Sequence, residues 1–229
     1  MIDAAPRGGK RARIPTPPRN TPLSRLLDVT QPAAASRVTA LDALELATQK
    51  WLAGERLDIG RLADELKIGR ATLFRWVGSK EQLYGEVISA AFGATLAWAI
   101  RRGTGTGAAY LTSVTDHLLR ALVASQPLRR FVRHDAELAL RIVMSSSSPV
   151  EHRVVTAVRE LIDAEVTAGQ LVPAMDTGSL AYVIVRIAES FLYRDVISGE
   201  APDVDTATRA IGLLFTAQAA QKPVRKRVR

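Results

Sequence analysis

Apolar residues recur every three or four positions through most of the chain, which is the spacing of amphipathic helices. No segment alternates convincingly between apolar and polar residues, as a half-buried strand would. We therefore expect an all-α protein with a small N-terminal domain and a larger C-terminal helical domain. The predicted helices cover residues 38–52, 58–66, 70–77, 80–102, 109–124, 128–144, 150–168, 178–196 and 205–219.

Polar residues and glycines mark where the first of these helices begin. Ser36 is a candidate N-cap for the first helix, because its hydroxyl can accept a hydrogen bond from a free N–H of the first turn. Asp58 can cap the second helix, and Gly69 is tolerated at the start of the third. Ser79 and Gln82 form an S-x-x-Q capping box, so a new helix is predicted to begin there.

Residues 57–87 carry the most informative pattern. Two short helices are joined by a tight turn at 67–69, and a Gly-Ser break precedes a third helix. Short helices joined by such a turn place the second helix in the major groove of DNA. No acidic residue lies between positions 67 and 80, whereas four cations do: Lys67, Arg70, Arg75 and Lys80. The pattern predicts a DNA-binding helix-turn-helix.

The net charge of +8 is concentrated at the two ends of the chain. Residues 1–22 hold five Lys or Arg and one Asp, and residues 222–229 hold five Lys or Arg. These tails either attract nucleic acid without reading its sequence or serve as disordered, solubilising ends. We expect a flexible basic arm at 1–35 and a basic tail at 221–229.

Several classes of protein and site are disfavoured. Cysteine is absent, which removes disulfides, thiolate metal sites and thiol nucleophiles. The N-terminus has no apolar run typical of a secretory signal, and the best membrane-span candidate, 180–193, is interrupted by Arg186 and Glu189. No catalytic, phosphate-binding or metal motif is present. We expect a cytoplasmic protein that is not an enzyme, contacts no membrane, and needs no cofactor or metal.

The segment 68–81, IGRATLFRWVGSKE, resembles the V-S-x-x-T-L-Y-x-x-F-x-S-K-E segment of the TetR family of bacterial transcriptional regulators. The resemblance lies mainly in residues 38–88 and includes the Leu62-Ala63 pair, which corresponds to Ile-Ala in the family. Three positions depart from the pattern: Gly69 replaces Ser or Thr, Val77 replaces a bulkier aromatic, and Lys67 stands where Gly is common, so that a small strain is expected in the turn.

The resemblance implies a helix-turn-helix domain at 36–82 and a ligand-binding and dimerisation domain at 83–220. The protein would be a homodimer whose last two long helices form a four-helix bundle with their twofold mates, and it would read a pseudo-palindromic operator. A small apolar or lactone-like effector would tilt the helix from 79 to 102 and release the DNA. The stretch 191–205 also looks like a subgroup linked to quorum-signal degradation.

The expected DNA contacts lie around the second short helix. Arg70 and Arg75 can bond guanine bidentately or pair with phosphate, and the resemblance places Thr72 and Phe74 against the backbone. The alternative is that Phe74 and Trp76 belong partly to the core and that the cations form a solvated face. The predicted DNA-binding residues are Arg37, Asp58, Gly69, Arg70, Ala71, Thr72, Phe74, Arg75, Trp76 and Lys80.

The expected ligand contacts are the sparse polar and aromatic side chains of an otherwise apolar C-terminal domain. They are His117, Arg120, Phe131, His134, Arg141, Glu189 and Tyr193. The histidines can equally lie at helix surfaces, and Glu189 can simply pair with Arg186. Three other readings stay open: a constitutive regulator or activator, an all-helical small-molecule-binding protein or enzyme with nonspecific basic tails, and a nonspecific nucleoid-type binder.

Overall fold

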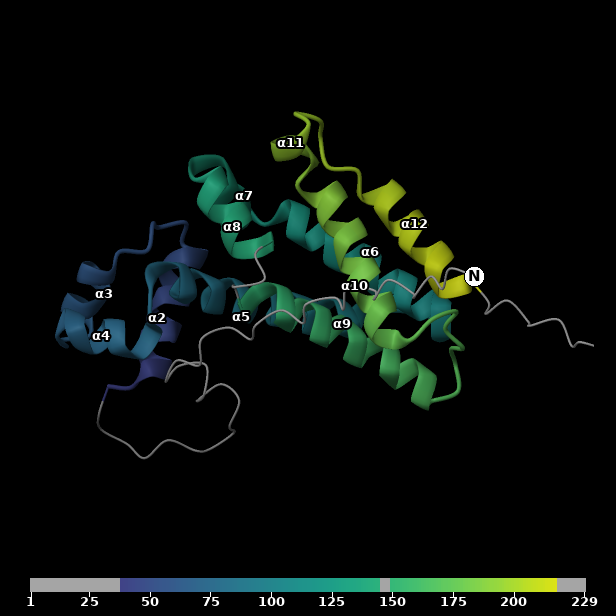
Figure 1. Cartoon of the computed structure of the whole chain (residues 1–229), viewed down its shortest axis with the longest axis horizontal. Coiled ribbons are helices and arrows are strands. Elements are labelled where there is room, and N and C mark those ends of the chain that lie inside the picture. The colour runs from purple at the N-terminus through teal and green to yellow at the C-terminus, as the bar shows by residue number, and fades with distance from the viewer. Residues whose placement is uncertain (1–37, 145–148, 218–229) are drawn as a thin grey trace, which may run out of the picture.

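The computed structural model describes residues 38–144 and 149–217, and within these ranges its regular elements are all helices (Figure 1). The prediction of an all-α protein with a helix-turn-helix head and a helical body is confirmed. The predicted arm at 1–35, Ser36, Arg37 and the tail at 221–229 lie outside the described residues.

The head consists of three helices at one end of the molecule (Figure 1): α2 (Ala40–Leu52), α3 (Ile59–Glu65) and α4 (Arg70–Val77). The N-cap of α2 is Thr39 and not Ser36 as predicted. The Thr39 hydroxyl accepts a hydrogen bond from the N–H of Asp42, and the Asp42 carboxylate accepts one from the N–H of Thr39 at 2.6 Å. This reciprocal capping box fixes the start of the helix three residues later than expected.

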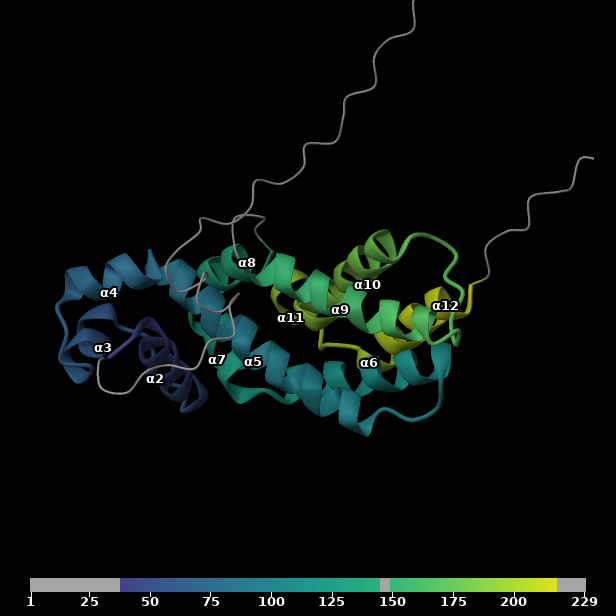
Figure 2. The same ribbon diagram turned by 90° about the horizontal axis from the view of Figure 1, so that it is seen from below.

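Helix α5 (Lys80–Arg102) runs from the head into the body and lies beside α6 and α9 (Figure 2). It begins at the predicted N-cap, where the Ser79 hydroxyl accepts a hydrogen bond from the N–H of Gln82 at 3.1 Å. By length and composition α5 is apolar enough to cross a membrane, unlike the 180–193 segment singled out from the sequence. Half of that apolar window is buried inside the protein, which accounts for its composition.

Helices α6 to α12 form the body, in which α6 packs against α12 and α9 against α10. The single helices predicted at 128–144 and 178–196 are each broken, at Asp135 and at Tyr193. Asp135 leaves the helical conformation and its carboxylate caps the next helix by accepting from the N–H of Leu138. The body helices are α6 (Gly107–Ala124), α7 (Gln126–His134), α8 (Ala136–Met144), α9 (Pro149–Thr167), α10 (Thr177–Leu192), α11 (Arg194–Ile197) and α12 (Val204–Thr216).

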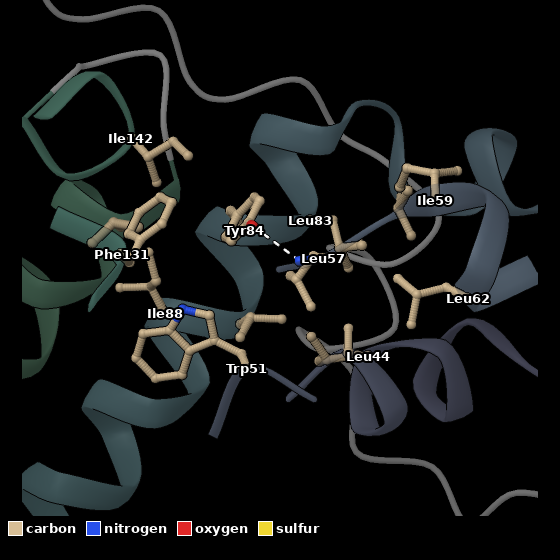
Figure 3. Close-up of a cluster of buried hydrophobic side chains, with 14 of the residues drawn as sticks. Leu44, Trp51, Leu57, Ile59, Leu62, Leu83, Tyr84, Ile88, Phe131 and Ile142 are labelled. Carbon is tan, nitrogen blue, oxygen red and sulfur yellow. Dashed lines mark hydrogen bonds between the residues drawn. The ribbon is translucent and has the colours of Figure 1, made fainter. Parts of the chain in front are cut away.

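One hydrophobic core joins the head to the adjacent part of the body (Figure 3). Trp51 and Leu57 from the head, Leu83 and Tyr84 from α5, and Phe131 from α7 all belong to it. The cluster continues without a break across residue 83, where the sequence predicted a domain boundary. Side chains of α5 and α7 therefore pack directly against those of the head.

Candidate nucleic-acid interface and internal cavity

Helix α4 is held in the head by one face and exposes the other. Leu73 and Val77, four residues apart, are completely buried, whereas Arg70, Ala71 and Arg75 are exposed. Gly69 at the N-cap contributes no side-chain hydrogen bond, so the first N–H groups of α4 are not capped by a side chain. Free N–H groups beside cations are suited to a phosphate.

The turn before α4 contains a strained residue. Lys67 has a φ of +54°, the left-handed conformation that glycine adopts without a steric penalty. The strain expected from the sequence at this position is thus present. The turn lets α3 and α4 cross closely at Ala63, which has no exposed surface.

The four cations of the segment 67–80 are available for an external partner. None of Lys67, Arg70, Arg75 and Lys80 forms an ion pair within 38–144 and 149–217. Lys67, Arg70 and Arg75 are exposed, and the ammonium of Lys80 lies 5.8 Å above the ring of Tyr84. An unpaired cationic surface next to an uncapped helix start is what binding to a nucleic-acid backbone requires.

Other predicted DNA-binding residues occupy different places. Asp58 caps α3 by accepting from the N–H of Arg61 at 2.9 Å, and this hydrogen bond lowers the pKa of its carboxyl. Thr72 and Trp76 are half-buried, and Trp76 packs against the core as the sequence alternative allowed. Phe74 keeps 46% of its surface exposed, although large apolar side chains are usually buried, so its ring is accessible to a partner.

Tyr84 links the head, α5 and α7, a role that was not apparent from the sequence (Figure 3). Its hydroxyl accepts a hydrogen bond from the N–H of Leu57 at 3.0 Å. Its ring stacks on Phe131, with ring centroids 4.7 Å apart and an interplanar angle of 14°. Burial raises the pKa of Tyr84. The residue thus ties the loop between α2 and α3 to the body.

Glu86 makes a second link from α5, in this case to α9. Its side chain is buried, with 5% exposed, and its Oε2 lies 2.5 Å from Nη1 of Arg153. Tyr84 and Glu86 lie within one turn of α5 and contact α7 and α9 respectively.

A cavity of about 330 Å³ lies among α5, α6, α9 and α10, with further walls from α2, α7, α8 and α12. Its lining is almost entirely aliphatic and aromatic. The hydroxyls of Thr48, Thr95 and Thr115 each donate to a carbonyl four residues back in their own helix. The volume and the lining are those of a site for a small apolar molecule.

One charged residue, Glu189, lines this cavity, and it is connected to Arg186 and Glu151, which lie outside the lining. Glu189 is buried, and its Oε2 lies 3.1 Å from Nη1 of Arg186. Nη2 of Arg186 lies 2.9 Å from Oε1 of Glu151. Burial raises the pKa of Glu189 to about 7, with Arg186 opposing and Glu151 reinforcing the shift. Tyr193 is buried in the same lining, and burial raises the pKa of its hydroxyl.

The residues predicted to contact a ligand are not brought together. Glu189 and Tyr193 line the cavity, whereas Phe131 and His134 line a separate hollow of about 360 Å³ beside the loop between α2 and α3. His117, Arg120 and Arg141 line neither. His117 stands edge-on to Trp98, Arg120 pairs with Asp116 and Asp205, and Arg141 pairs with Glu137.

Sequence reasoning missed Glu151 and most of the apolar lining of the cavity. Only a three-dimensional arrangement unites residues from these eight helices, although the apolar face of each helix was visible. Within the described ranges, no three His, Cys, Asp or Glu side chains are grouped closely enough to hold a metal ion.

Comparisons with known proteins bear on both parts of the molecule. Residues 106–216 match the family model described as the tetracyclin repressor-like C-terminal domain. The fold is similar to the solved structure of the transcriptional repressor QsdR of the TetR family from R. erythropolis, with a TM-score of 0.74 and 29% sequence identity. That similarity covers 80% of this chain and 97% of QsdR. No curated protein sequence matches this chain.

Proposed function

The chain belongs to the TetR family of transcriptional regulators, and we propose that it is a ligand-responsive repressor that binds DNA through α4. The observation that carries the proposal is the exposed face of α4 with its unpaired cations. Arg70 and Arg75 would pair with phosphate or with guanine, and the free N–H groups at Arg70 and Ala71 would face a phosphate.

The proposed functional unit is a homodimer formed through α10 and α12. Both helices carry large apolar side chains at the surface: Tyr182 on α10 is 49% exposed and Leu213 on α12 is 70% exposed. Burying these side chains against a second copy would stabilise the pair. Two copies of α4 about 34 Å apart would read a pseudo-palindromic operator.

The proposed inducer is a small apolar or lactone-like molecule that occupies the cavity. Trp51 and Ile88 line the cavity and also belong to the core shared with the head, so a ligand contacting them would bias the position of α4. By linkage, a ligand that weakens DNA binding is itself bound more weakly when DNA is present. We place such a regulator in the cytoplasm, where it meets both DNA and effector.

The test uses genomic DNA fragments captured by the full-length protein, followed by binding isotherms on the enriched sequence. Replacing both Arg70 and Arg75 by Ala is expected to weaken specific binding by at least about 30-fold, since each base contact contributes roughly 1–3 kcal/mol. The matched control replaces Arg101 on α5 and Arg159 on α9, two exposed arginines of the body outside the proposed dimer helices, and removes the same charge. Equal binding by both double variants would refute the proposal.

Deleting residues 1–30 and 222–229 separates this reading from that of a nonspecific binder. If the tails alone hold the DNA, the truncated protein binds no fragment. If α4 reads the operator, truncation weakens binding and preserves the preference for the enriched sequence over a scrambled one.

A further inference from the structure

Two carboxylates share one guanidinium beside the cavity, and one of the carboxylates, that of Glu189, lines it. Arg186 lies 2.9 Å from Glu151 and 3.1 Å from Glu189, measured between the nearest charged atoms. If both acids were ionised, the trio would carry one uncompensated negative charge beside an apolar cavity. Such a charge is costly to bury, so either one acid holds a proton or an external group compensates.

The acid expected to hold the proton is Glu189. Its side chain is 10% exposed, against 19% for Glu151, and it faces the cavity. Oε2 of Glu189 is fully buried and makes no hydrogen bond to any described residue, although it lies near Arg186. The pKa of about 7 that burial gives this carboxyl agrees with the choice. A protonated Glu189 makes the trio neutral overall and supplies an O–H donor.

We propose that the cavity binds an uncharged amphiphile that presents a carbonyl oxygen to Glu189 and lays its alkyl chain along the apolar walls. An acid of the same length would place a second anion next to Glu189 and Glu151 with only Arg186 to compensate. The three threonine hydroxyls of the lining donate to their own helices, which leaves Ser125 and Tyr193 as its other hydroxyls besides Glu189. This inference rests on the proposed function in one respect: the ligand that the cavity binds would be the effector that changes DNA binding.

The donor at Glu189 gives the site a pH dependence. The titratable or charged groups around it are Arg186 and Tyr193 on its own side and Glu151 from α9, and no histidine lies in the cavity lining. Raising the pH removes the proton from Glu189 and replaces a donor with an anion, which repels a carbonyl oxygen. Affinity for a neutral carbonyl compound therefore falls as the pH rises through about 7.

The experiment compares four probes with ten-carbon chains, namely decan-2-one, decanoate, decylamine and decane, titrated into full-length protein without DNA. Binding is followed by calorimetry and by tryptophan fluorescence, to which Trp51 in the cavity lining contributes together with Trp76 and Trp98. At about pH 6 the ketone is expected to bind roughly tenfold more tightly than decane or decanoate, the worth of one hydrogen bond to a buried group. Its affinity is expected to fall about tenfold by about pH 8.5.

Variants separate recognition by Glu189 from simple packing. Glu189→Gln keeps an N–H donor and is expected to retain ketone binding while losing the pH dependence. Glu189→Leu lacks the donor and is expected to bind ketone and decane alike. Glu160→Gln, an exposed acid on α9, serves as the matched control and should behave as wild type. Circular dichroism checks that each variant is folded, and the wild-type pH series requires no variant.

Three outcomes overturn the inference. Equal affinity for ketone and decane would show that no polar group recognises the carbonyl. Tightest binding of decylamine would show that Glu189 pairs with a cation. A ketone affinity that does not change with pH would show that the donor is not a titrating carboxyl. Because no DNA is present, these outcomes leave the proposed regulatory function untested. The α4 double variant tests that function independently.

Discussion

Replacing Tyr84 by Phe tests whether the head is tied to the body through a single buried hydroxyl. The substitution removes the Oη atom that accepts from the N–H of Leu57 at 3.0 Å and leaves the ring that stacks on Phe131. Leu57 has no exposed surface, so water cannot replace the lost acceptor without opening the loop. The packing of the ring is retained, so the free energy of unfolding falls only by the cost of leaving the buried N–H of Leu57 without an acceptor.

That cost is about 1–3 kcal/mol, which exceeds the net worth of an ordinary hydrogen bond because the desolvated N–H stays behind. For a chain of this size the loss lowers the melting temperature by roughly 2–10 °C. The local effect is larger than the global one, since the loop between α2 and α3 opens without the rest of the molecule. The amide of Leu57 should therefore exchange its hydrogen faster by about tenfold or more.

Thermal unfolding at fixed protein concentration and amide hydrogen exchange provide the two readouts. Tyr110→Phe is the matched control, because the half-buried Tyr110 hydroxyl donates to the carbonyl of Ile100, which also accepts from the N–H of Gly103, so its loss strands no donor and should change stability by less than about 1 kcal/mol. If Tyr84→Phe is no less stable than the control and the exchange of Leu57 is unchanged, the reasoning is refuted and the hydroxyl does not hold the loop.

Three further substitutions probe the turn, the α5–α9 link and the buried acid. Lys67→Gly should raise the free energy of unfolding by roughly 0.5–1 kcal/mol in urea titrations because φ is +54° there, and an unchanged midpoint would show that the turn is unstrained. Arg153→Met removes the guanidinium that lies 2.5 Å from the buried Glu86 carboxylate and should cost roughly 2–4 kcal/mol of stability. Glu86→Gln should restore part of this loss in the double variant, and additive losses in calorimetry would contradict the pairing. Glu189 binds its proton more tightly in the folded than in the unfolded protein, so the free energy of unfolding should decline between about pH 4.5 and about pH 7. Glu189→Gln should flatten this decline in a series of melting temperatures. An unchanged dependence of melting temperature on pH would exclude Glu189 as its source.

The helix-turn-helix could be predicted because its signals are local. Asp58 and Ser79 each cap the helix that follows, as expected, and each does so through an N–H only three residues away. The error at the start of α2 had the same local basis. Thr39 and Asp42 form the complete capping box, and this pair was a stronger signal than the isolated Ser36.

The breaks at Asp135 and Tyr193 could not be read from periodicity. Apolar positions continue across both in the sequence, and α7 and α8, on either side of Asp135, bury their faces in the same core. At Asp135 the cause is a competing local interaction: the carboxylate caps α8 instead of continuing α7. An aspartate within a helical pattern is compatible with either outcome, and packing decides between them.

The ligand candidates show how far residue type can locate a site. His117, Arg120 and Arg141 were selected for polarity, but each finds a neighbour outside the cavity. Glu189 and Tyr193 were selected on the same ground and line it. The difference depends on which side of its helix each residue occupies and on which side chains of the neighbouring helix lie opposite it. Neither property can be read from the residue type.

The cavity itself is harder to predict than its lining, because a void is the difference between the space that the helices enclose and the volume of the side chains that fill it. Each wall residue, taken alone, is an ordinary core residue on an amphipathic helix. The polar point of the lining has the same origin. Arg186 and Glu189 are neighbours on one helix, but Glu151 reaches Arg186 from α9, and only the packing of α9 on α10 makes the second carboxylate surplus. The chemical selectivity we infer for the cavity therefore depends on a tertiary contact, and for that reason it is tested by exchanging charges at Glu189 and not by matching motifs.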